Sequence, residues 1–223
     1  MRLILRRYND IICLTMGKIT DIQKQKKNRT RVSIFIDGDF VCGLDEVAVL
    51  SARIKVGDNI TAEELKSVME KSELNSAFER AIGYLSRAPR AKKEIKKYLS
   101  DKGYDKAIIE QTIEKLCMYH YIDDYSYAQS YIKSKSKKYG AYRLSAELKQ
   151  KGIAQDVIEE LLEAAPEDNI IDIARKYLRS HKSADKQKLK RFLAGRGFSW
   201  DSINGAVDTL ADELSSVGAD YDE

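Results

Sequence analysis

A short pattern recurs three times in the second half of the chain. A lysine or arginine precedes a glycine, which is followed by an aromatic residue or isoleucine, and the three glycines stand 49 and 45 residues apart. Self-similarity at such a period is typical of a stacked helical array, which presents an extended surface rather than a pocket. The three copies are Lys102-Gly103-Tyr104, Lys151-Gly152-Ile153 and Arg196-Gly197-Phe198.

Apolar residues keep the same register around each glycine and predict three helices per repeat. Upstream, each repeat carries Ala-x-x-Tyr-[Leu/Ile], which marks the first helix. The second helix ends at the glycine, which supplies the positive φ of a helix C-cap, and the preceding base complements the negative helix end. Asp105 and Ser199 are expected to cap the third helices. The expected buried positions are Ile95, Leu99, Leu144, Leu148, Leu189 and Leu193 before the glycines, and Ile109, Ile113, Ile158, Leu162, Ile203 and Val207 after them.

A different pattern precedes the repeats and predicts a small β-rich unit. Two short apolar runs, Arg31–Ile36 and Phe40–Gly43, flank Asp37-Gly38. An Asp-Gly pair between such runs is typical of a β-hairpin. Residues 19–22 are expected to add a third strand.

The fold class expected is therefore mainly α, with three tandem three-helix repeats after a small β-rich α+β leader. In the leader, Thr61 and Glu64 have the spacing of a capping box and predict a helix that runs to about Lys71. The expected divisions are 1–16 as a disordered or upstream segment, 17–73 as the leader, 75–125, 126–168 and 169–214 as the repeats, and 215–223 as an acidic tail.

Composition excludes two classes of protein. No apolar run approaches the ~20 residues that a membrane-spanning helix needs. Three scattered cysteines argue against a disulfide framework and fit a reducing compartment. Residues 1–15 faintly resemble a secretory signal, but their apolar stretch is broken and no small-residue cleavage site follows. The alternative is that translation starts at Met16 and that these residues are upstream sequence or a mobile arm.

The net charge of +4 conceals an uneven distribution of charge along the repeats. Residues 174–197 hold nine Lys or Arg and one acid. Residues 152–173 and 201–223 each hold seven acids and no Lys or Arg. The bases of a repeat therefore precede its glycine, and most of its acids follow it.

The middle helices are the functional candidates because their outward faces are basic. At ~100° per residue, Lys97 falls opposite the buried stripe of its helix. A single charged helix is usually just solvated, but recurrence in three repeats favours a strip of cations that faces a polyanion or an acidic protein groove. Tyr98, Tyr142 and Phe192 come from the same helices, where stacking on bases is conceivable but core packing is the favoured interpretation for Phe192. The strip is expected to comprise Arg90, Lys93, Lys97, Lys137, Lys138, Arg143, Lys149, Lys188 and Arg191.

The chain is not expected to be an enzyme. His120 and His181 are its two histidines, and neither has a nearby Cys or carboxylate at metal-ligand spacing. There is no glycine-rich phosphate loop and no nucleophile elbow. The carboxylate pair Asp123-Asp124 could bind a metal, but an acid that caps the next helix is the favoured interpretation. We therefore expect no catalytic residue, no cofactor and no metal site.

The chain resembles the RecX family of recombination regulators over residues 75–214, with a weaker match in the leader. No single motif is specific, but their order and spacing together carry the resemblance. The motifs are Ala81-x-x-Tyr84-Leu85; Glu94-Ile95-x-x-x-Leu99-x-x-Lys102-Gly103-Tyr104; Tyr121-Ile122-Asp123-Asp124-x-x-Tyr127-Ala128; and Gly140-x-x-Arg143-Leu144-x-x-Glu147-Leu148-x-x-Lys151-Gly152-Ile153.

This resemblance implies a cytoplasmic, non-enzymatic protein that binds the RecA recombinase, often as its filament on single-stranded DNA. Such proteins lodge in the filament groove and modulate, here most simply inhibit, its ATPase, strand-exchange and coprotease activities. We expect a monomer that contacts RecA and nearby single-stranded DNA. We do not expect it to contact a membrane. Two alternatives remain open: a sequence-independent nucleic-acid binder that acts without RecA, and a helical scaffold for another protein.

Overall fold

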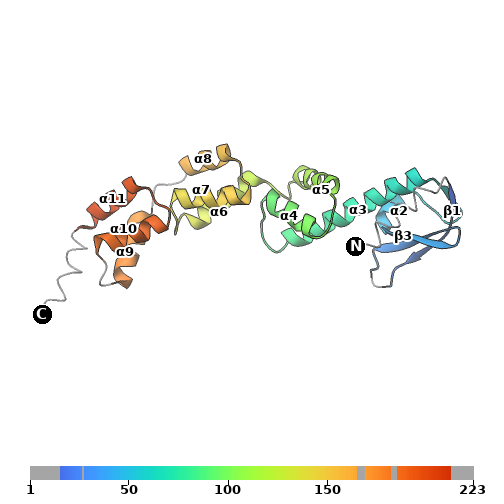
Figure 1. Ribbon diagram of the computed structural model, residues 1–223, viewed down its shortest axis with the longest axis horizontal. Helices are drawn as coiled ribbons and strands as arrows, with labels where there is room; N and C mark the ends of the chain where they lie inside the picture. The colour runs from blue at the N-terminus through green and yellow to red at the C-terminus, as the bar shows by residue number, and fades with distance from the viewer. Residues whose placement is uncertain (1–15, 27, 165–168, 182–184, 212–223) are drawn as a thin grey trace. The chain divides into compact units, whose positions relative to one another are not determined.

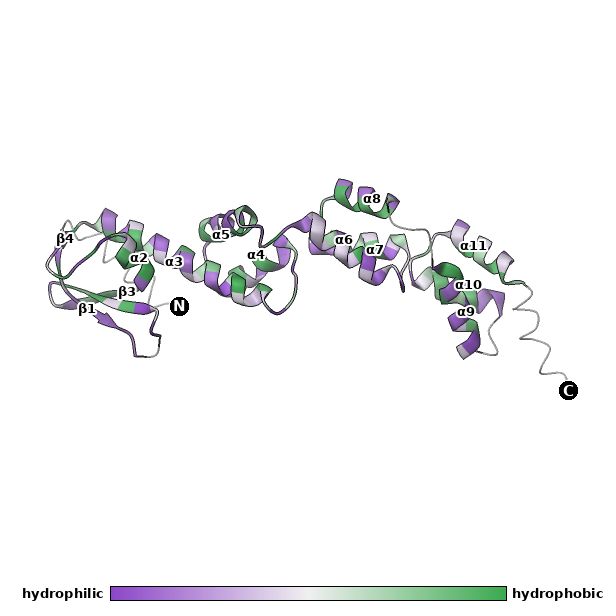
Figure 2. Ribbon diagram, turned by 180° about the vertical axis from the view of Figure 1, so that it is seen from behind, coloured by the Kyte–Doolittle hydropathy of each residue, from purple (hydrophilic) through white to green (hydrophobic). Residues whose placement is uncertain are grey.

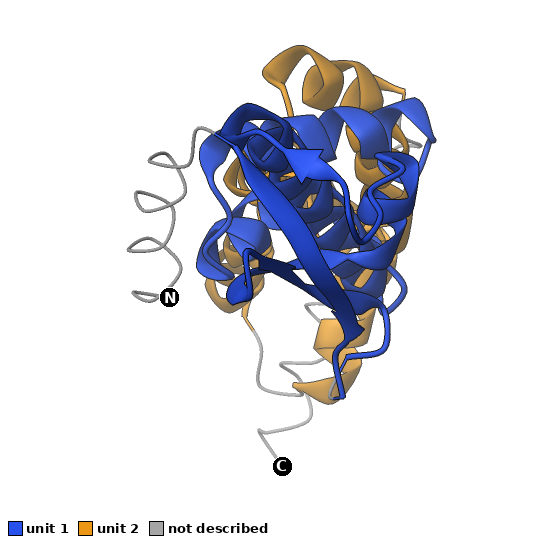
Figure 3. Ribbon diagram, turned by 90° about the vertical axis from the view of Figure 1, so that its right-hand side faces the viewer, with its two compact units in different colours: residues 1–90, 94–122 blue, residues 91–93, 123–223 orange. Residues whose placement is uncertain are grey.

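The chain divides into two compact units, which we call the first and second units (Figure 3). The first comprises residues 1–90 and 94–122, and the second comprises residues 91–93 and 123–223. The expected acidic tail and, except for Met16, the expected upstream segment lie outside the described residues. The computed structural model describes residues 16–26, 28–164, 169–181 and 185–211.

The leader contains an antiparallel sheet with strand order β3-β2-β1-β4 (Figure 1). The hairpin predicted at Asp37-Gly38 is confirmed, and both residues have positive φ, 50° and 93°, as a type I′ turn requires. The predicted third strand is confirmed as β1, whereas β4 was not expected. The strands are β1 Gly17–Lys24, β2 Arg31–Ile36, β3 Asp39–Asp45 and β4 Asn59–Ile60.

Alternating side chains of the sheet form the leader core. Along β2, Val32, Ile34 and Ile36 are buried while the residues between them are half-buried, which is the period-2 pattern of a strand with one core face. The short helix α2 (Glu46–Ser51) follows β3 directly, and the carboxylate of Asp45 caps it by accepting from two backbone N–H groups.

Helix α3 (Ala62–Leu85) runs through both the leader and the first repeat. Its predicted capping box is confirmed, since the Thr61 hydroxyl and the Glu64 carboxylate each bond the other's backbone N–H. The predicted end near Lys71 is wrong. No proline interrupts the segment, and its buried residues serve two cores in turn, Leu65 and Val68 in the leader and then Ala77 and Ala81 in the first repeat.

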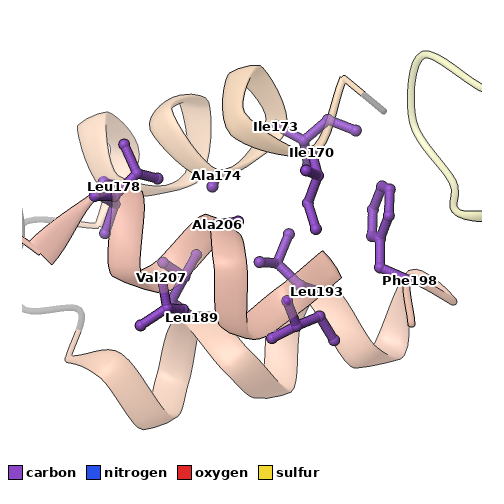
Figure 4. Close-up of a cluster of buried hydrophobic side chains, with 11 residues drawn as sticks. Ile170, Ile173, Ala174, Leu178, Leu189, Leu193, Phe198, Ala206 and Val207 are labelled. Carbon is purple, nitrogen blue, oxygen red and sulfur yellow. The ribbon is translucent and has the colours of Figure 1, made fainter. Parts of the chain in front are cut away.

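Each repeat packs three helices around a core of its own, and apolar residues lie on the helix sides that face that core (Figures 2 and 4). The six predicted buried positions before the glycines are confirmed, with 0–2% exposure. After the glycines one position differs, because Leu161 is buried and Leu162 is only half-buried. The remaining helices are α4 Lys92–Asp101, α5 Lys106–Met118, α6 Asp124–Lys135, α7 Ala141–Lys151, α8 Gln155–Glu163, α9 Ile170–Ser180, α10 Lys186–Gly195 and α11 Trp200–Thr209.

The glycine of each repeat ends the middle helix as predicted. Gly103, Gly152 and Gly197 have φ of 85°, 86° and 83°, a left-handed conformation that an L-side chain adopts only with strain. The third helices then begin at different caps. Ser199 caps α11 with a hydrogen bond to the backbone N–H of Ser202, whereas Asp105 occupies the cap of α5 without such a bond.

The second and third repeats meet through their backbones, within the second unit. The amide of Gly140 donates to the carbonyl of Arg196 at 3.0 Å, and the amide of Tyr142 donates to the carbonyl of Gly197 at 3.1 Å. A Cβ at Gly140 would lie 2.4 Å from the Gly197 carbonyl oxygen. A Cβ at Gly197 would lie 2.5 Å from the backbone nitrogen of Arg143. We call this contact the glycine joint; both glycines are needed for it to form.

Replacing Gly197 by alanine should destabilise the second unit. The variant must adopt a positive φ, which costs about 1–3 kcal/mol, and its Cβ also collides with the backbone at Arg143. Urea denaturation monitored by circular dichroism measures the free energy of unfolding. The matched control is Gly195→Ala, two residues earlier, where no atom lies within 4 Å of a Cβ. Equal losses of stability in the two variants would contradict this explanation of the joint.

Candidate interface of basic side chains

Seven of the nine predicted basic side chains are exposed, while Arg90 and Arg143 are half-buried. On α4, Ile95 and Leu99 are fully buried and Lys97 is exposed, so the predicted helix face is correct. Arg90 and Lys97 belong to the first unit and the other seven to the second. The exposed set is Lys93, Lys97, Lys137, Lys138, Lys149, Lys188 and Arg191.

Two of the exposed lysines also make contacts within the second unit. The Nζ atom of Lys93 donates to the carbonyl of Gln150 at 3.1 Å, and its aliphatic chain lies where a Cβ at Gly152 would be. Lys188 lies 4.0 Å from the carboxylate of Asp185, which also caps α10. Surface ion pairs of this kind contribute little stability.

The half-buried Arg90 takes part in a stack of side chains in the first repeat. The rings of Tyr84 and Tyr98 are parallel within 8°, with their centroids 4.2 Å apart. The Arg90 guanidinium lies 4.8 Å from the centroid of Tyr84, and the Lys102 ammonium lies 5.5 Å from that of Tyr98. We call these four residues the first-repeat stack. Arg90 also pairs with Glu94 at 3.7 Å.

The third repeat contains a stack of the same kind. Tyr177 lies between the rings of His181 and Phe192, at centroid distances of 4.3 and 4.1 Å. The Arg196 guanidinium then covers Phe192 at 4.5 Å. These four residues are the third-repeat stack. Cation–ring contacts of this type hold a half-buried cation without a carboxylate partner.

Arg196 connects the third-repeat stack to the second repeat, because it also lies near the ring of Tyr139. Its guanidinium lies 5.9 Å from the centroid of Tyr139, and the Arg143 guanidinium covers the same ring at 4.0 Å. One Nη of Arg196 donates to the carbonyl of Lys138 at 3.0 Å. Its Nε is buried with no hydrogen-bond partner among the described residues, so planar stacking provides much of the contact.

The second repeat has a hydrogen-bonded carboxylate, Glu147, at the position where the other two repeats have a ring. Glu147 accepts from the hydroxyl of Tyr131 at 2.5 Å and from Nε of Arg143 at 2.9 Å. These two bonds, the tyrosine hydroxyl first, hold the pKa of Glu147 below its ordinary value. Burial and the same carboxylate raise the pKa of Tyr131. The ammonium of Lys151 lies 5.6 Å from the Tyr131 ring, as a base does in each of the other repeats.

The sequence carried a signal for these contacts that the helix-end interpretation missed. The base before each glycine was expected only to complement a helix end, yet Lys102, Lys151 and Arg196 all lie over rings. The first helix of each repeat has a recurrent tyrosine, namely Tyr84, Tyr131 or Tyr177. The residue that contacts this tyrosine is five positions before the glycine. That position holds Tyr98, Glu147 and Phe192 in the three repeats.

The remaining candidate groups have structural surroundings. Asp123 caps α6 as predicted, and its bond from the Ser126 hydroxyl is the main cause of its lowered pKa. Asp124 accepts from the backbone amide of Lys92 at 2.9 Å. Burial raises the pKa of the Cys42 thiol to about 12. Within the described ranges, no three or more His, Cys, Asp or Glu side chains gather as a metal site would need, and no helix is long and apolar enough to cross a membrane.

Family comparisons match the chain in four consecutive parts. Residues 17–61 match the description "Regulatory protein RecX N-terminal domain". Residues 77–116, 123–162 and 166–207 match the first, second and third three-helix domains of RecX. Each match coincides with one of the elements described above: the sheet and the three helical repeats.

Relatives and solved structures agree with this division. The regulatory protein RecX of Clostridium botulinum strain Eklund 17B is 33% identical over 86% of this chain and 95% of its own length. That of Clostridioides difficile strain 630 is 31% identical over 87% and 96%. A crystal structure titled regulatory protein RecX is 25% identical, with a TM-score of 0.68 over 88% of this chain and 99% of that one. RecX from Lactobacillus salivarius shares the fold, with 24% identity and a TM-score of 0.57 over 62% of this chain and 97% of that one.

Replacing Arg196 by lysine should weaken the contact between the second and third repeats. A lysine retains the charge but loses the planar stacking on Phe192 and Tyr139, so we expect a loss of about 1–2 kcal/mol in the free energy of unfolding. Chemical denaturation measures it. Lys102→Arg is the matched control, because it keeps a cation over Tyr98, and it should change stability by less than about 0.5 kcal/mol. An Arg196→Lys variant as stable as the parent would refute a stabilising role for the stack.

The stability contributed by Glu147 should depend on pH. Its pKa is lower in the folded than in the unfolded chain, so the contribution is complete above the ordinary value of 4.5 and is lost as pH falls through the folded pKa. The difference in unfolding free energy between the parent and Glu147→Gln should therefore be large near about pH 7 and shrink toward about pH 3. If the difference in unfolding free energy stays constant over this pH range, the charge of the Glu147 carboxylate does not stabilise the fold.

Proposed function

The chain belongs to the RecX family, and on this premise we propose that it regulates the RecA recombinase by binding the RecA filament on single-stranded DNA. Binding most simply inhibits the ATPase, strand-exchange and coprotease activities of the filament, in the cytoplasm and without any chemistry by this chain. Relatives named regulatory protein RecX support the regulatory role. Filament binding and inhibition go beyond those names.

One observation supports this proposal above the others: exposed cations lie on the middle helix of every repeat. Lys97 on α4, Lys149 on α7 and Arg191 on α10 are exposed, while the apolar stripes of the same helices are fully buried. Lys137 and Lys138 add two exposed charges directly before α7. Long, flexible cations on a fixed scaffold suit the phosphates of a nucleic acid and the carboxylates of a protein groove.

We divide the predicted basic residues between two proposed roles. Arg143 pairs with Glu147 and covers Tyr139, and Arg90 covers Tyr84, so we assign both as positioning residues that hold the helices. The contact role then falls to the exposed bases. This division matters for mutagenesis, because a variant at Arg143 would change both charge and packing.

A second function remains in competition: a sequence-independent nucleic-acid binder that acts without RecA. The same exposed cations favour it, because phosphate contacts carry no sequence information. The two functions differ in what they require. Titration of this protein into RecA on single-stranded DNA should lower the ATPase rate at substoichiometric amounts if the filament is the target. An unchanged rate together with salt-sensitive DNA binding would favour the second function.

Reversing the exposed cations should weaken inhibition strongly without unfolding the chain. In a variant with Lys97, Lys137, Lys138, Lys149 and Arg191 all changed to Glu, we expect half-inhibition of the RecA ATPase to need about tenfold more protein or more. Circular dichroism should show unchanged helix content, because these side chains are exposed.

A matched charge-reversal variant controls for net charge. The first unit also has five exposed lysines that are not part of the predicted strip, and the same number of reversals there should leave inhibition intact: Lys18, Lys55, Lys66, Lys71 and Lys106. If both variants lose inhibition equally, total charge and not the basic helix faces determines binding. If the first variant inhibits fully, the proposed contact surface is wrong.

A further inference from the structure

Two aromatic side chains of the second unit are left in solvent. Tyr142 is 69% exposed and Trp200 is 63% exposed, the highest values for aromatic residues in the described part of the chain. Neither ring stacks on another aromatic ring among the described residues, unlike the tyrosines of the repeat stacks. Most of the surface of each side chain is therefore accessible to a partner.

Both rings come from the glycine joint and are therefore held on a rigid base. Tyr142 donates its backbone amide to the Gly197 carbonyl, so its side chain begins at the contact itself. Trp200 opens α11 only three residues after Gly197, directly behind the capping residue Ser199. Because backbone hydrogen bonds and helix caps fix these two positions, little freedom of the backbone is lost when a partner binds the rings.

Cations gather at the same joint. Lys137 and Lys138 are exposed, and the Arg196 guanidinium holds the carbonyl of Lys138 against the third repeat. Arg143 lies on the other side of the contact. Asp201, next to Trp200, is an exposed charge of opposite sign near the rings. Arg143 is paired with Glu147, but Lys137, Lys138 and Arg196 outnumber Asp201, so the joint favours an anionic partner.

We propose that single-stranded nucleic acid binds at the glycine joint, where its bases stack on Tyr142 and Trp200 and its phosphates meet Lys137 and Lys138. Exposed rings beside cations are the chemistry that single strands require, since every unpaired base has a face to stack and every nucleotide carries a charge. A duplex keeps its bases stacked inside and does not offer them. The proposal rests on the proposed function, of which it names the nucleic-acid site.

Another exposed aromatic group shows why the joint differs. Tyr119 and Tyr121, in the first unit, are each 54% exposed, but their rings pack edge-on against Phe78 and against each other at 6.0–6.5 Å. Lys115 lies over Phe78 and not beside an open ring face. Tyr119 and Tyr121 are therefore control residues for Tyr142: they are also exposed tyrosines, but their rings already pack against other rings.

The single tryptophan of the chain makes the test direct, because all tryptophan fluorescence comes from Trp200. The protein alone, without RecA, is titrated with an oligothymidylate and with an abasic oligonucleotide of the same length and charge. We expect quenching by the first and little by the second. Tyr142→Ala should weaken binding of a labelled oligothymidylate, measured by anisotropy, by about tenfold. Trp200→Ala should do the same, while Trp200→Phe should restore most of the affinity.

Tyr119→Ala is the matched control and should bind like the parent. Salt dependence separates stacking from charge, because Tyr142→Ala should keep the slope of affinity against salt while Lys137→Glu with Lys138→Glu lowers it. Equal quenching by the abasic strand or equal binding of duplex would each overturn the stacking site. The RecA ATPase titration is a separate measurement. If oligothymidylate does not quench Trp200 but the ATPase is inhibited, the stacking site is wrong and the proposed regulation of the filament is not affected. If oligothymidylate quenches Trp200 but the ATPase is not inhibited, only the proposed regulation is refuted.

Discussion

Much of the architecture depends on one backbone conformation, the positive φ of a glycine at the end of each middle helix. The left-handed residue stops the helix and turns the chain into the next one, so the two helices can share a core. The missing side chain has a second effect at Gly197, where the neighbouring repeat approaches to backbone contact. The turn also fixes the residue before it, which is why a base in that place repeatedly lies over a ring. A single geometric requirement thus sets the helix end, the spacing of two repeats and the position of a cation.

The charges of the repeats divide between those that build the scaffold and those that face solvent. Arg90, Arg143 and Arg196 spread their planar guanidinium groups over aromatic rings, which a compact ammonium does less well. The exposed positions are mostly lysines, which stay hydrated and mobile. Within the predicted strip, both half-buried bases are arginines, whereas six of the seven exposed bases are lysines.

The sequence predicted the features that depend on local rules and missed those that depend on tertiary neighbours. The hairpin, the capping box, the left-handed glycines and the buried stripes each follow from residue type and spacing within a few positions, and each is confirmed except at Leu162 of the stripes. The end of the helix that begins at Ala62 was misplaced because no local sequence signal sets its length. The helix continues because it packs first against the leader core and then against the core of the first repeat. Arg143 was assigned to the surface although Tyr139 and Glu147 stand four residues before and after it, because that spacing does not show that the guanidinium is half-buried between them. The contact role of the exposed bases stays a prediction, since exposure alone does not identify a partner.

Helix α3 has a consequence for how the first unit gains and loses its structure. One continuous helix supplies side chains to the leader core and then to the core of the first repeat, and the amide of Asp45 is bonded to the Ser72 hydroxyl in its middle. Opening either core strips the helix of half its packing, and a helix of this kind gains most of its stability from packing. The sheet and the first repeat should therefore behave as a single cooperative block in hydrogen exchange, although their sequences have nothing in common. Seen this way, the leader is part of the folding unit of the repeat that follows it.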